Sequence, residues 1–517
     1  MPRAATQLRR YAILIHRWTG VFFCVLFVVW FVSGIVLMYW DYPDVSSEER
    51  LEKAPALDAS LILTTPLDAV RSLGFARPPD QVQLTMLDAR PVYRLRAARG
   101  QFIVYADTGE PFEERLPDAA LRIASTFTGQ PSSSARFDGL NESEDQWTVS
   151  QNFRALRPLY VYSWPDGETV YLSSVTGEVV QRTTRGSRIG AYFGAIPHWL
   201  YFTPLRKNGP LWSRVVICSS GIGTAMSLLG IAVGLWSYSP SKRYRFPAGR
   251  SSIPYAGWKH WHTILGLFFG LVTCTWVFSG MLSMSPFEAL SEDRGDPRVA
   301  AALRGGPLDL NAFSARPVRE AVAQVEIPVK ELELTSLAGE PFYRALSVGR
   351  SRLIPMTGAP LEALDQSSIA STIAQSLGVD ALAETRLVTE YEAYYLSRHS
   401  ERPLPVVFVR LNDGESSMYY IDPRSGRVVS SYTNAGRWNR WLYHGLHSLD
   451  LPWLYRHRPA WDLLVLALML GGTALCVTSV WIACRRLRQK VSMIRAAARI
   501  RATARATARR QRQSASL

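Results

Sequence analysis

Residues 11–40 read YAILIHRWTGVFFCVLFVVWFVSGIVLMYW, and residues 257–286 read GWKHWHTILGLFFGLVTCTWVFSGMLSMSP. Both stretches are apolar over at least the roughly 20 residues that an α-helix needs to cross a bilayer. Each carries a histidine near its start, His16 in the first and His262 in the second. Polar side chains within membrane spans are usually functional, because hydrocarbon offers an imidazole no hydrogen-bond partner. The two stretches therefore predict membrane-spanning helices that contribute to a shared site.

The two stretches match each other position by position, which indicates an internal duplication. At a constant offset of 246 residues, the matched positions are His16, Gly20, Phe23, Trp30, Ser33, Gly34 and Met38 against His262, Gly266, Phe269, Trp276, Ser279, Gly280 and Met284. At an offset of 249, a second pair of apolar segments matches through Pro210, Trp212, Gly223, Thr224 and Ala225 against Pro459, Trp461, Gly472, Thr473 and Ala474. The segments between the spans match through Leu84, Thr85, Leu87, Pro91, Tyr93 and Arg94 against Leu334, Thr335, Leu337, Pro341, Tyr343 and Arg344. We therefore expect two copies of a span–external domain–span unit, as parallel repeats about an axis along the membrane normal.

The distribution of charge predicts the orientation of the chain in the membrane. The 517 residues include 58 Lys and Arg against 43 Asp and Glu, a net charge of +15. Three acid-free regions carry the excess: the N-terminal stretch, the connector after the second span and the tail after the fourth. All three lie on the same side of a four-span protein, and the positive-inside rule places that side in the cytoplasm. The basic excess is thus a topology signal, with contact to anionic membrane lipid as a secondary effect, and nucleic-acid binding is not expected.

The expected fold is an α-helical membrane bundle of four transmembrane helices with external α+β domains. The first span is expected to be a retained anchor, because it is long and lacks the small-residue cleavage site of a signal peptide. All five cysteines fall within or at the ends of spans, so we expect no external disulfide. The expected parts are a cytoplasmic N-terminus (1–10), four spans (11–40, 211–238, 263–284 and 461–484), two external regions (41–210 and 285–460), a basic cytoplasmic connector (239–262) and a basic cytoplasmic tail (485–517).

Each external region is expected to contain two small α+β units, built as antiparallel sheets with a helix on one face. Helical patterns occur at 66–73, 119–127, 318–325 and 369–377. Alternating patterns that predict strands follow them, for example at 92–95, 102–105, 160–163 and 170–173. Thr-Gly and Ser-Gly pairs predict hairpin turns at 108–109, 176–177, 357–358 and 425–426. An aromatic group is interpreted as sheet core and comprises Trp147, Tyr160, Tyr162 and Trp164.

Four of the eight histidines form two pairs that the duplication relates. His16 and His262 lie near the cytoplasmic face, whereas His198 and His447 precede the second and fourth spans near the external face. A b-type haem with two axial histidines needs one imidazole from each of two facing helices, which a twofold-related pair supplies. The spacing therefore predicts two haem b sites, with the iron of one held by His16 and His262 and the iron of the other by His198 and His447. The second-choice ligands are His260 and His444, while two further residues, His399 and His457, are expected on the surface.

Other roles for these histidines are compatible with the sequence. A Zn²⁺ or copper site would need three or four converging ligands, and a proton relay would need only the polar rings themselves. A histidine at the membrane interface also serves as a hydrogen-bonded anchor. Trp30 and Trp276, in the middle of the membrane, are interpreted as packing residues or as aromatic groups that help electrons to pass. The motif C-x-x-C-H is absent, which excludes covalently attached c-type haem.

Several of the residues quoted above carry a resemblance to a known family. Ile15-His16-Arg17-Trp18-Thr19-Gly20 and Trp261-His262-Thr263-Ile264-Leu265-Gly266 resemble the His-Arg-Trp-x-Gly element of the PepSY-associated transmembrane family of bacterial iron-regulated inner-membrane proteins, which includes siderophore-iron reductases. Gly445-Leu446-His447-Ser448-Leu449 is similar to the Leu-His element that precedes the last span of that family. Ile196-Pro197-His198-Trp199 is a variant of the same element, with Pro197 in place of leucine. The resemblance extends from about Leu8 to Arg486.

The resemblance implies a multi-pass protein of the bacterial inner membrane with both termini inside and with periplasmic PepSY-like domains. It further implies two b-type haems and the reduction of a ferric siderophore or another periplasmic ferric chelate, which would make the protein an oxidoreductase of iron uptake. No G-x-G-x-x-G fingerprint for a nicotinamide or flavin cofactor follows a strand, so the expected electron donor is a quinol or a cytoplasmic reductase.

Two other functions remain as alternatives. In the first alternative, the PepSY-like domains form a non-enzymatic module that binds a peptide, a protease or a receptor, and the histidines serve only in packing. The second is a transporter, which is disfavoured because the spans contain neither a buried acid pair nor a broken helix. The colour of the purified protein separates the haem hypothesis from the binding module.

Overall fold

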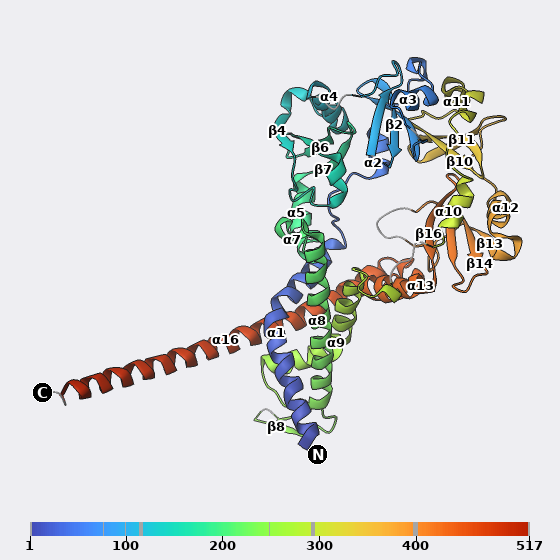
Figure 1. Cartoon of the computed structure of the whole chain (residues 1–517). Helices are drawn as coiled ribbons and strands as arrows, with labels where there is room; N and C mark the ends of the chain where they lie inside the picture. Colours follow the sequence, from blue (N-terminus) through green and yellow to red (C-terminus); the bar gives the residue numbers. More distant parts are fainter. Residues whose placement is uncertain are drawn as a thin grey trace.

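Four long helices form the membrane part of the protein (Figure 1). The structure is a computed structural model, which describes residues 3–75, 77–98, 100–112, 117–247, 249–290, 295–396 and 402–514. The four helices are α1 (Arg3–Leu37), α8 (Gly209–Ser237), α9 (Trp258–Leu282) and α16 (Ala460–Ser514). All four are long and apolar enough to cross a membrane. The prediction of four apolar helices is thus confirmed, whereas the helical structure of the basic tail, which continues α16 to Ser514, was not predicted.

The helices pack so that α1 and α9 lie across the bundle from one another. Each of these two helices packs against both α8 and α16. The centre of the bundle is filled with buried aromatic side chains, including Phe27, Phe31 and Trp276. Trp30 stacks on Phe27 with 5.8 Å between ring centroids, and Trp276 lies 5.8 Å from Phe31. Both tryptophans therefore pack against phenylalanines in the centre of the bundle.

The described residues of the first extramembrane region form seven strands. Its helices and 3₁₀ turns are α2 (Ser47–Lys53), η1 (Ala59–Leu61), α3 (Pro66–Ser72), α4 (Pro117–Thr128), η2 (Ser132–Ser134) and η3 (Gln151–Leu156). Its strands are β1 (Gln81–Leu87), β2 (Arg90–Ala97), β3 (Gly100–Tyr105), β4 (Arg136–Asn141), β5 (Leu159–Ser163), β6 (Thr169–Ser173) and β7 (Val179–Thr183). Three short helices then lead to the membrane, α5 (Arg185–Phe193), α6 (Ala195–Trp199) and α7 (Thr203–Arg206). A small hairpin, β8 (Tyr244–Phe246) and β9 (Gly249–Ser251), lies between α8 and α9.

The second extramembrane region follows a similar order of elements. Its helices and 3₁₀ turns are η4 (Glu288–Leu290), α10 (Pro297–Arg304), η5 (Ala312–Ala315), α11 (Val318–Ala323), α12 (Gln366–Leu377) and η6 (Val379–Ala381). Its strands are β10 (Glu331–Leu337), β11 (Glu340–Ser347), β12 (Arg350–Pro355), β13 (Leu382–Val388), β14 (Val406–Leu411), β15 (Met418–Asp422) and β16 (Arg427–Tyr432). The segments that lead to the last span are α13 (Asn434–Arg440), the π-helical turn η7 (Trp441–Gly445), α14 (Leu446–Ser448) and α15 (Pro452–Tyr455).

The two regions share one antiparallel sheet of six strands, in the order β12-β11-β10-β1-β2-β3. At its centre β1 pairs with β10, so that Leu84 lies opposite Leu332. Leu84 also faces Tyr93 within the first half of the sheet, and Leu334 faces Tyr343 within the second. All of these side chains are buried in one hydrophobic core. The α+β units are therefore confirmed, but the pairing that joins the two regions was not predicted.

Each region also has a four-stranded sheet nearer the bundle, and the extramembrane part arches over the helices in Figure 1. The orders are β4-β5-β6-β7 and β13-β14-β15-β16. Tyr160, Tyr162 and Trp164 are buried with α4 in the core of the first of these sheets, as predicted. Trp147 lies apart from them, against Tyr42 at 6.2 Å between ring centroids.

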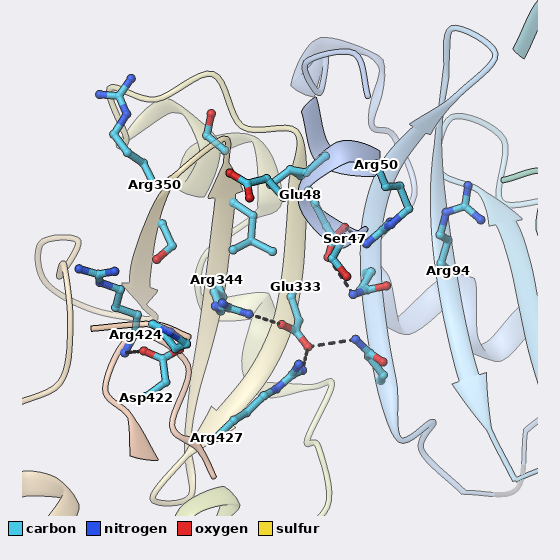
Figure 2. Close-up of a pocket in the computed structure, with 18 of the residues that line it drawn as sticks. Ser47, Glu48, Arg50, Arg94, Glu333, Arg344, Arg350, Asp422, Arg424 and Arg427 are labelled. Carbon is cyan, nitrogen blue, oxygen red and sulfur yellow. Dashed lines mark hydrogen bonds and ion pairs between the residues drawn. The ribbon is translucent and has the colours of Figure 1, made fainter. Parts of the chain in front are cut away.

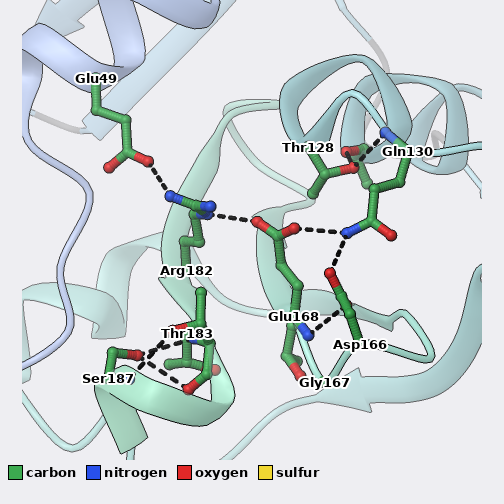
Figure 3. Close-up of polar contacts among 12 residues, drawn as sticks. Glu49, Thr128, Gln130, Asp166, Gly167, Glu168, Arg182, Thr183 and Ser187 are labelled. Atoms are coloured by element: carbon green, nitrogen blue, oxygen red, sulfur yellow. Dashed lines mark hydrogen bonds and ion pairs between the residues drawn. The ribbon is translucent and has the colours of Figure 1, made fainter. Parts of the chain in front are cut away.

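A polar network connects the first four-stranded sheet to the segment that follows α1 (Figure 3). Arg182 donates to Glu49 of α2 at 2.7 Å and to Glu168 at 2.5 Å. Glu168 is buried and also accepts a hydrogen bond from Gln130 at 2.6 Å. Because a buried carboxylate is stable only with such partners, the network holds α2 in place beside β7.

Candidate functional site

His16 of α1 and His262 of α9 face each other across the bundle. Their ring centroids lie 6.3 Å apart, with 30° between the ring planes. Both rings line a cavity of about 240 Å³, which Gly20 and Gly266 also line. A glycine one helical turn after each histidine leaves the space beside the ring open. The structure thus brings together the first pair of predicted site residues, which we call the α1–α9 pair.

The neighbouring helices fix the orientation of these two rings. His16 Nδ1 lies 3.0 Å from the carbonyl oxygen of Met226 in α8. This oxygen can only accept a hydrogen bond. His262 Nδ1 lies 3.1 Å from the hydroxyl of Thr478 and 3.3 Å from that of Ser479, both in α16. Each hydroxyl donates its own hydrogen to the carbonyl of Leu475, so it accepts from the histidine. In both rings Nδ1 therefore carries the hydrogen, and Nε2 keeps its lone pair.

His198 of α6 and His447 of α14 form the second pair, which we call the α6–α14 pair. Their ring centroids lie 6.1 Å apart, with 61° between the ring planes. The two histidines project from short helices next to the bundle. Burial lowers the pKa of His198 to about 4, so its ring is neutral at physiological pH. A neutral imidazole is the form that binds a metal ion.

Equivalent contacts hold both rings of the α6–α14 pair. His198 Nδ1 lies 3.1 Å from the carbonyl oxygen of Trp30 and 3.2 Å from the hydroxyl of Ser33. His447 Nδ1 lies 3.1 Å from the carbonyl oxygen of Trp276 and 3.1 Å from the hydroxyl of Ser279. Each serine also donates to the same tryptophan carbonyl. All four predicted histidines thus donate a hydrogen bond from Nδ1.

The spacing of each pair fits a metal ion held between two imidazoles. Two metal–nitrogen bonds of about 2 Å each, with about 1 Å from nitrogen to ring centre, place two ring centroids about 6 Å apart. The two observed separations, 6.3 Å and 6.1 Å, agree with this value. The α1–α9 cavity is also lined by Arg17, Lys259 and Arg486, whose charges suit the two carboxylates of a haem. The residues present therefore fit a bis-histidine haem.

The other histidines take different positions. The ring of His260 lies edge-on to Trp261 at 6.1 Å, and that of His444 lies 4.5 Å from Tyr443. His457 is exposed, as predicted, and His399 falls outside the described residues. Across the part of the chain that the structure describes, no group of three or more His, Cys, Asp or Glu side chains is arranged to hold a metal ion.

Sequence reasoning missed the residues that orient the histidines. Trp30 and Ser33 recur as Trp276 and Ser279 at the offset of 246, so the sequence did single these positions out. Nothing in the sequence connects them to His198 or His447, which lie 165 or more residues away. Gly230 of α8 was not singled out either, although it lies directly against the ring of His16.

Four apolar helices, an α+β extramembrane part and two partly buried histidine pairs define a multi-pass membrane protein with polar sites inside its bundle. The chain belongs to the family described as the PepSY-associated TM region, which it matches over residues 13–328. This range contains His16, His198 and His262 but ends before His447. The family expected from the sequence is thereby confirmed. A comparison with curated proteins found no match.

Proposed function

We propose that this protein binds two b-type haems and carries electrons across the bacterial inner membrane to a ferric siderophore or another ferric chelate in the periplasm. The observation that carries the proposal is the pairing of four partly buried histidines at the separation that one shared iron requires. Each haem would supply one-electron transfer through its iron. The chain itself would orient the imidazoles through Nδ1 and provide cations near the α1–α9 pair.

The positions of the two pairs along α1 support transfer across the bilayer. His16 belongs to one pair, and Ser33, 17 residues later in the same helix, holds His198 of the other. At 1.5 Å per residue the two sites are separated by about 25 Å along the helix axis. The hydrocarbon core of a bilayer is about 30 Å thick, so the two sites fall near its opposite surfaces.

The proposal includes the orientation of the chain in the membrane and its origin by an internal duplication. The acid-free basic regions place both termini and the β8–β9 connector in the cytoplasm, with the sheets in the periplasm. A quinol or a cytoplasmic reductase would then donate electrons near His16 and His262. The equivalent contacts of His198 and His447 support a duplicated span–external domain–span unit, with the two copies as parallel repeats.

The spectrum of the purified full-length protein tests the proposal. We expect a reduced-minus-oxidised difference spectrum of low-spin b haem, with two haems per chain. His16→Ala or His262→Ala should remove one haem, and His198→Ala or His447→Ala should remove the other, because each iron would lose one axial ligand. Colourless protein from haem-replete cells would contradict the proposal and leave the non-enzymatic binding module. Loss of both haems from any one of these substitutions would contradict the pairing.

A further inference from the structure

A large cavity lies against the six-stranded sheet, at the seam where β1 pairs with β10 (Figure 2). Its volume is about 960 Å³. In Figure 2 arginines reach it from both regions, with Arg50 and Arg94 on one side of the seam and Arg344 and Arg350 on the other. Arg424, from the turn after β15, lines the cavity on the same side as Arg350. The cavity is lined by nine arginines and six acidic residues, so its wall carries excess positive charge.

The most buried acidic residues of the wall already have arginine partners. Glu333 is 2% exposed, accepts from Arg344 at 3.2 Å and is also bound by Arg427. Glu331 is 3% exposed and pairs with Arg50 at 3.3 Å. Arg50 also binds Glu178 at 3.0 Å. The Arg50–Glu331 pair joins the two regions, and each of these carboxylates is neutralised by an arginine. These pairs leave neither Glu331 nor Glu333 without an arginine partner.

Four lining arginines have no carboxylate partner among the described residues. They are Arg96, Arg350, Arg402 and Arg424. In addition, Arg402 Nη1 and Arg344 Nε are buried nitrogen atoms without a hydrogen-bond partner. A buried donor without a partner is costly and is usually satisfied by a ligand or an ordered water. The unpaired guanidinium groups therefore mark the cavity as a binding site for anions.

The size and chemistry of the cavity indicate a small ligand with several carboxylates. Sites for small molecules typically enclose about 300–1,000 Å³, a range that includes this cavity. A guanidinium group binds a carboxylate through two parallel hydrogen bonds, and a concave wall of one sign concentrates ions of the other.

The cavity is connected to the α6–α14 pair through the segment that precedes β14. Tyr391 lines the cavity, and two residues later the carbonyl of Ala393 accepts a hydrogen bond from Arg440 at 3.0 Å. Arg440 ends α13, which leads through η7 to His447. A ligand in the cavity thus lies against a segment that is hydrogen-bonded to the helix before His447.

We propose that this cavity binds a small polyanionic metal chelate with free carboxylates, held by Arg350, Arg402 and Arg424. The identification of the metal as ferric iron rests on the proposed function, whereas the charge selectivity rests on the cavity alone. The protein accordingly discriminates between chelates by net charge, and it excludes cationic chelates.

Calorimetric titration of the purified full-length protein with gallium(III) citrate tests this proposal. The gallium complex is anionic, and Ga³⁺, unlike Fe³⁺, is not reduced. Its binding therefore does not depend on electron transfer. We expect the double variant Arg350→Gln, Arg424→Gln to raise the dissociation constant about 10-fold or more, because two charge-assisted contacts are lost. Arg350→Lys, Arg424→Lys should restore part of the affinity. The matched control is Arg136→Gln, which removes an exposed arginine of β4 that pairs with Asp138 outside the cavity.

The outcomes separate this proposal from the proposed function. Absence of gallium citrate binding, equal affinity of the double variant and the wild type, or equal binding of a cationic gallium trihydroxamate would each overturn the charge-selective cavity. Colourless protein that binds gallium citrate as expected would overturn only the haem proposal. Red protein that fails to bind gallium citrate would overturn only the cavity.

Discussion

At the scale of single residues, Gly230 shows how closely α8 approaches the α1–α9 pair. A Cβ atom at this position would lie 2.6 Å from Cε1 of His16 and 3.1 Å from its Nδ1. Real Cβ atoms essentially never approach another heavy atom to 2.6 Å, so any side chain here would displace the ring. The same ring is held by the carbonyl of Met226, one helical turn earlier in α8. One helix therefore both orients His16 and makes room for it.

We predict that Gly230→Ala weakens haem binding at the α1–α9 pair by about 10-fold or more, since changes in the groups that orient a ligand typically have effects of this size. The measurement is the haem content and difference spectrum of the purified variant. The spectrum of the second haem should remain. Gly221→Ala is the matched control, because its Cβ would only come within 3.6 Å of Met281 Sδ, which is an ordinary contact. Equal haem content in Gly230→Ala and the wild type would contradict the role of this glycine.

Ser33 and Ser279 show how much of a residue's role the sequence predicts. Their recurrence at a fixed offset was evident from the sequence, as was that of Gly34 and Gly280. Their contact with His198 and His447 was not, because α6 and α14 reach the bundle through long extramembrane regions. The sequence pattern identified which residues recur at a fixed offset, and tertiary contacts identified which histidines these residues hold.

At the scale of secondary-structure elements, the β1–β10 seam depends on buried ion pairs. Glu333 of β10 accepts from Gln81 of β1 at 3.1 Å and from Arg344 of β11 at 3.2 Å. It is also bound by Arg427, which comes from the other sheet of the same region. A single carboxylate of β10 thus connects this strand with β1, β11 and β16.

We predict that Glu333→Ala destabilises the extramembrane part by about 3 kcal/mol, because it leaves the partly buried Arg344 guanidinium without its carboxylate. Thermal unfolding followed by circular dichroism measures the effect. Asp138→Ala removes the carboxylate of an exposed pair with Arg136 and should cost no more than about 1 kcal/mol. Similar unfolding midpoints for the two variants would show that the seam does not depend on this carboxylate.

At the scale of the whole molecule, the four helices and the charge distribution predict which parts lie on each side of the membrane. In a cysteine-free background, Ser133→Cys in η2 should react with a membrane-impermeant maleimide in intact spheroplasts. Ser492→Cys in the basic part of α16 should react only after the membrane is opened, because the positive-inside rule retains that segment in the cytoplasm. Both serines are exposed, so a difference in labelling reports topology and not burial. The reverse pattern would contradict the proposed orientation.

The sequence by itself determined the four apolar helices, the family and the candidate histidines, because these follow from local composition, length and spacing. It also predicted the α+β units, since alternating patterns and turn residues are local signals. Tertiary structure alone decided that His16 lies 6.3 Å from His262 and that His198 lies 6.1 Å from His447. It alone paired β1 with β10 and formed the arginine-lined cavity at their seam. The physical reason is that these features depend on contacts between residues far apart in the chain, for which a single sequence carries no local signal.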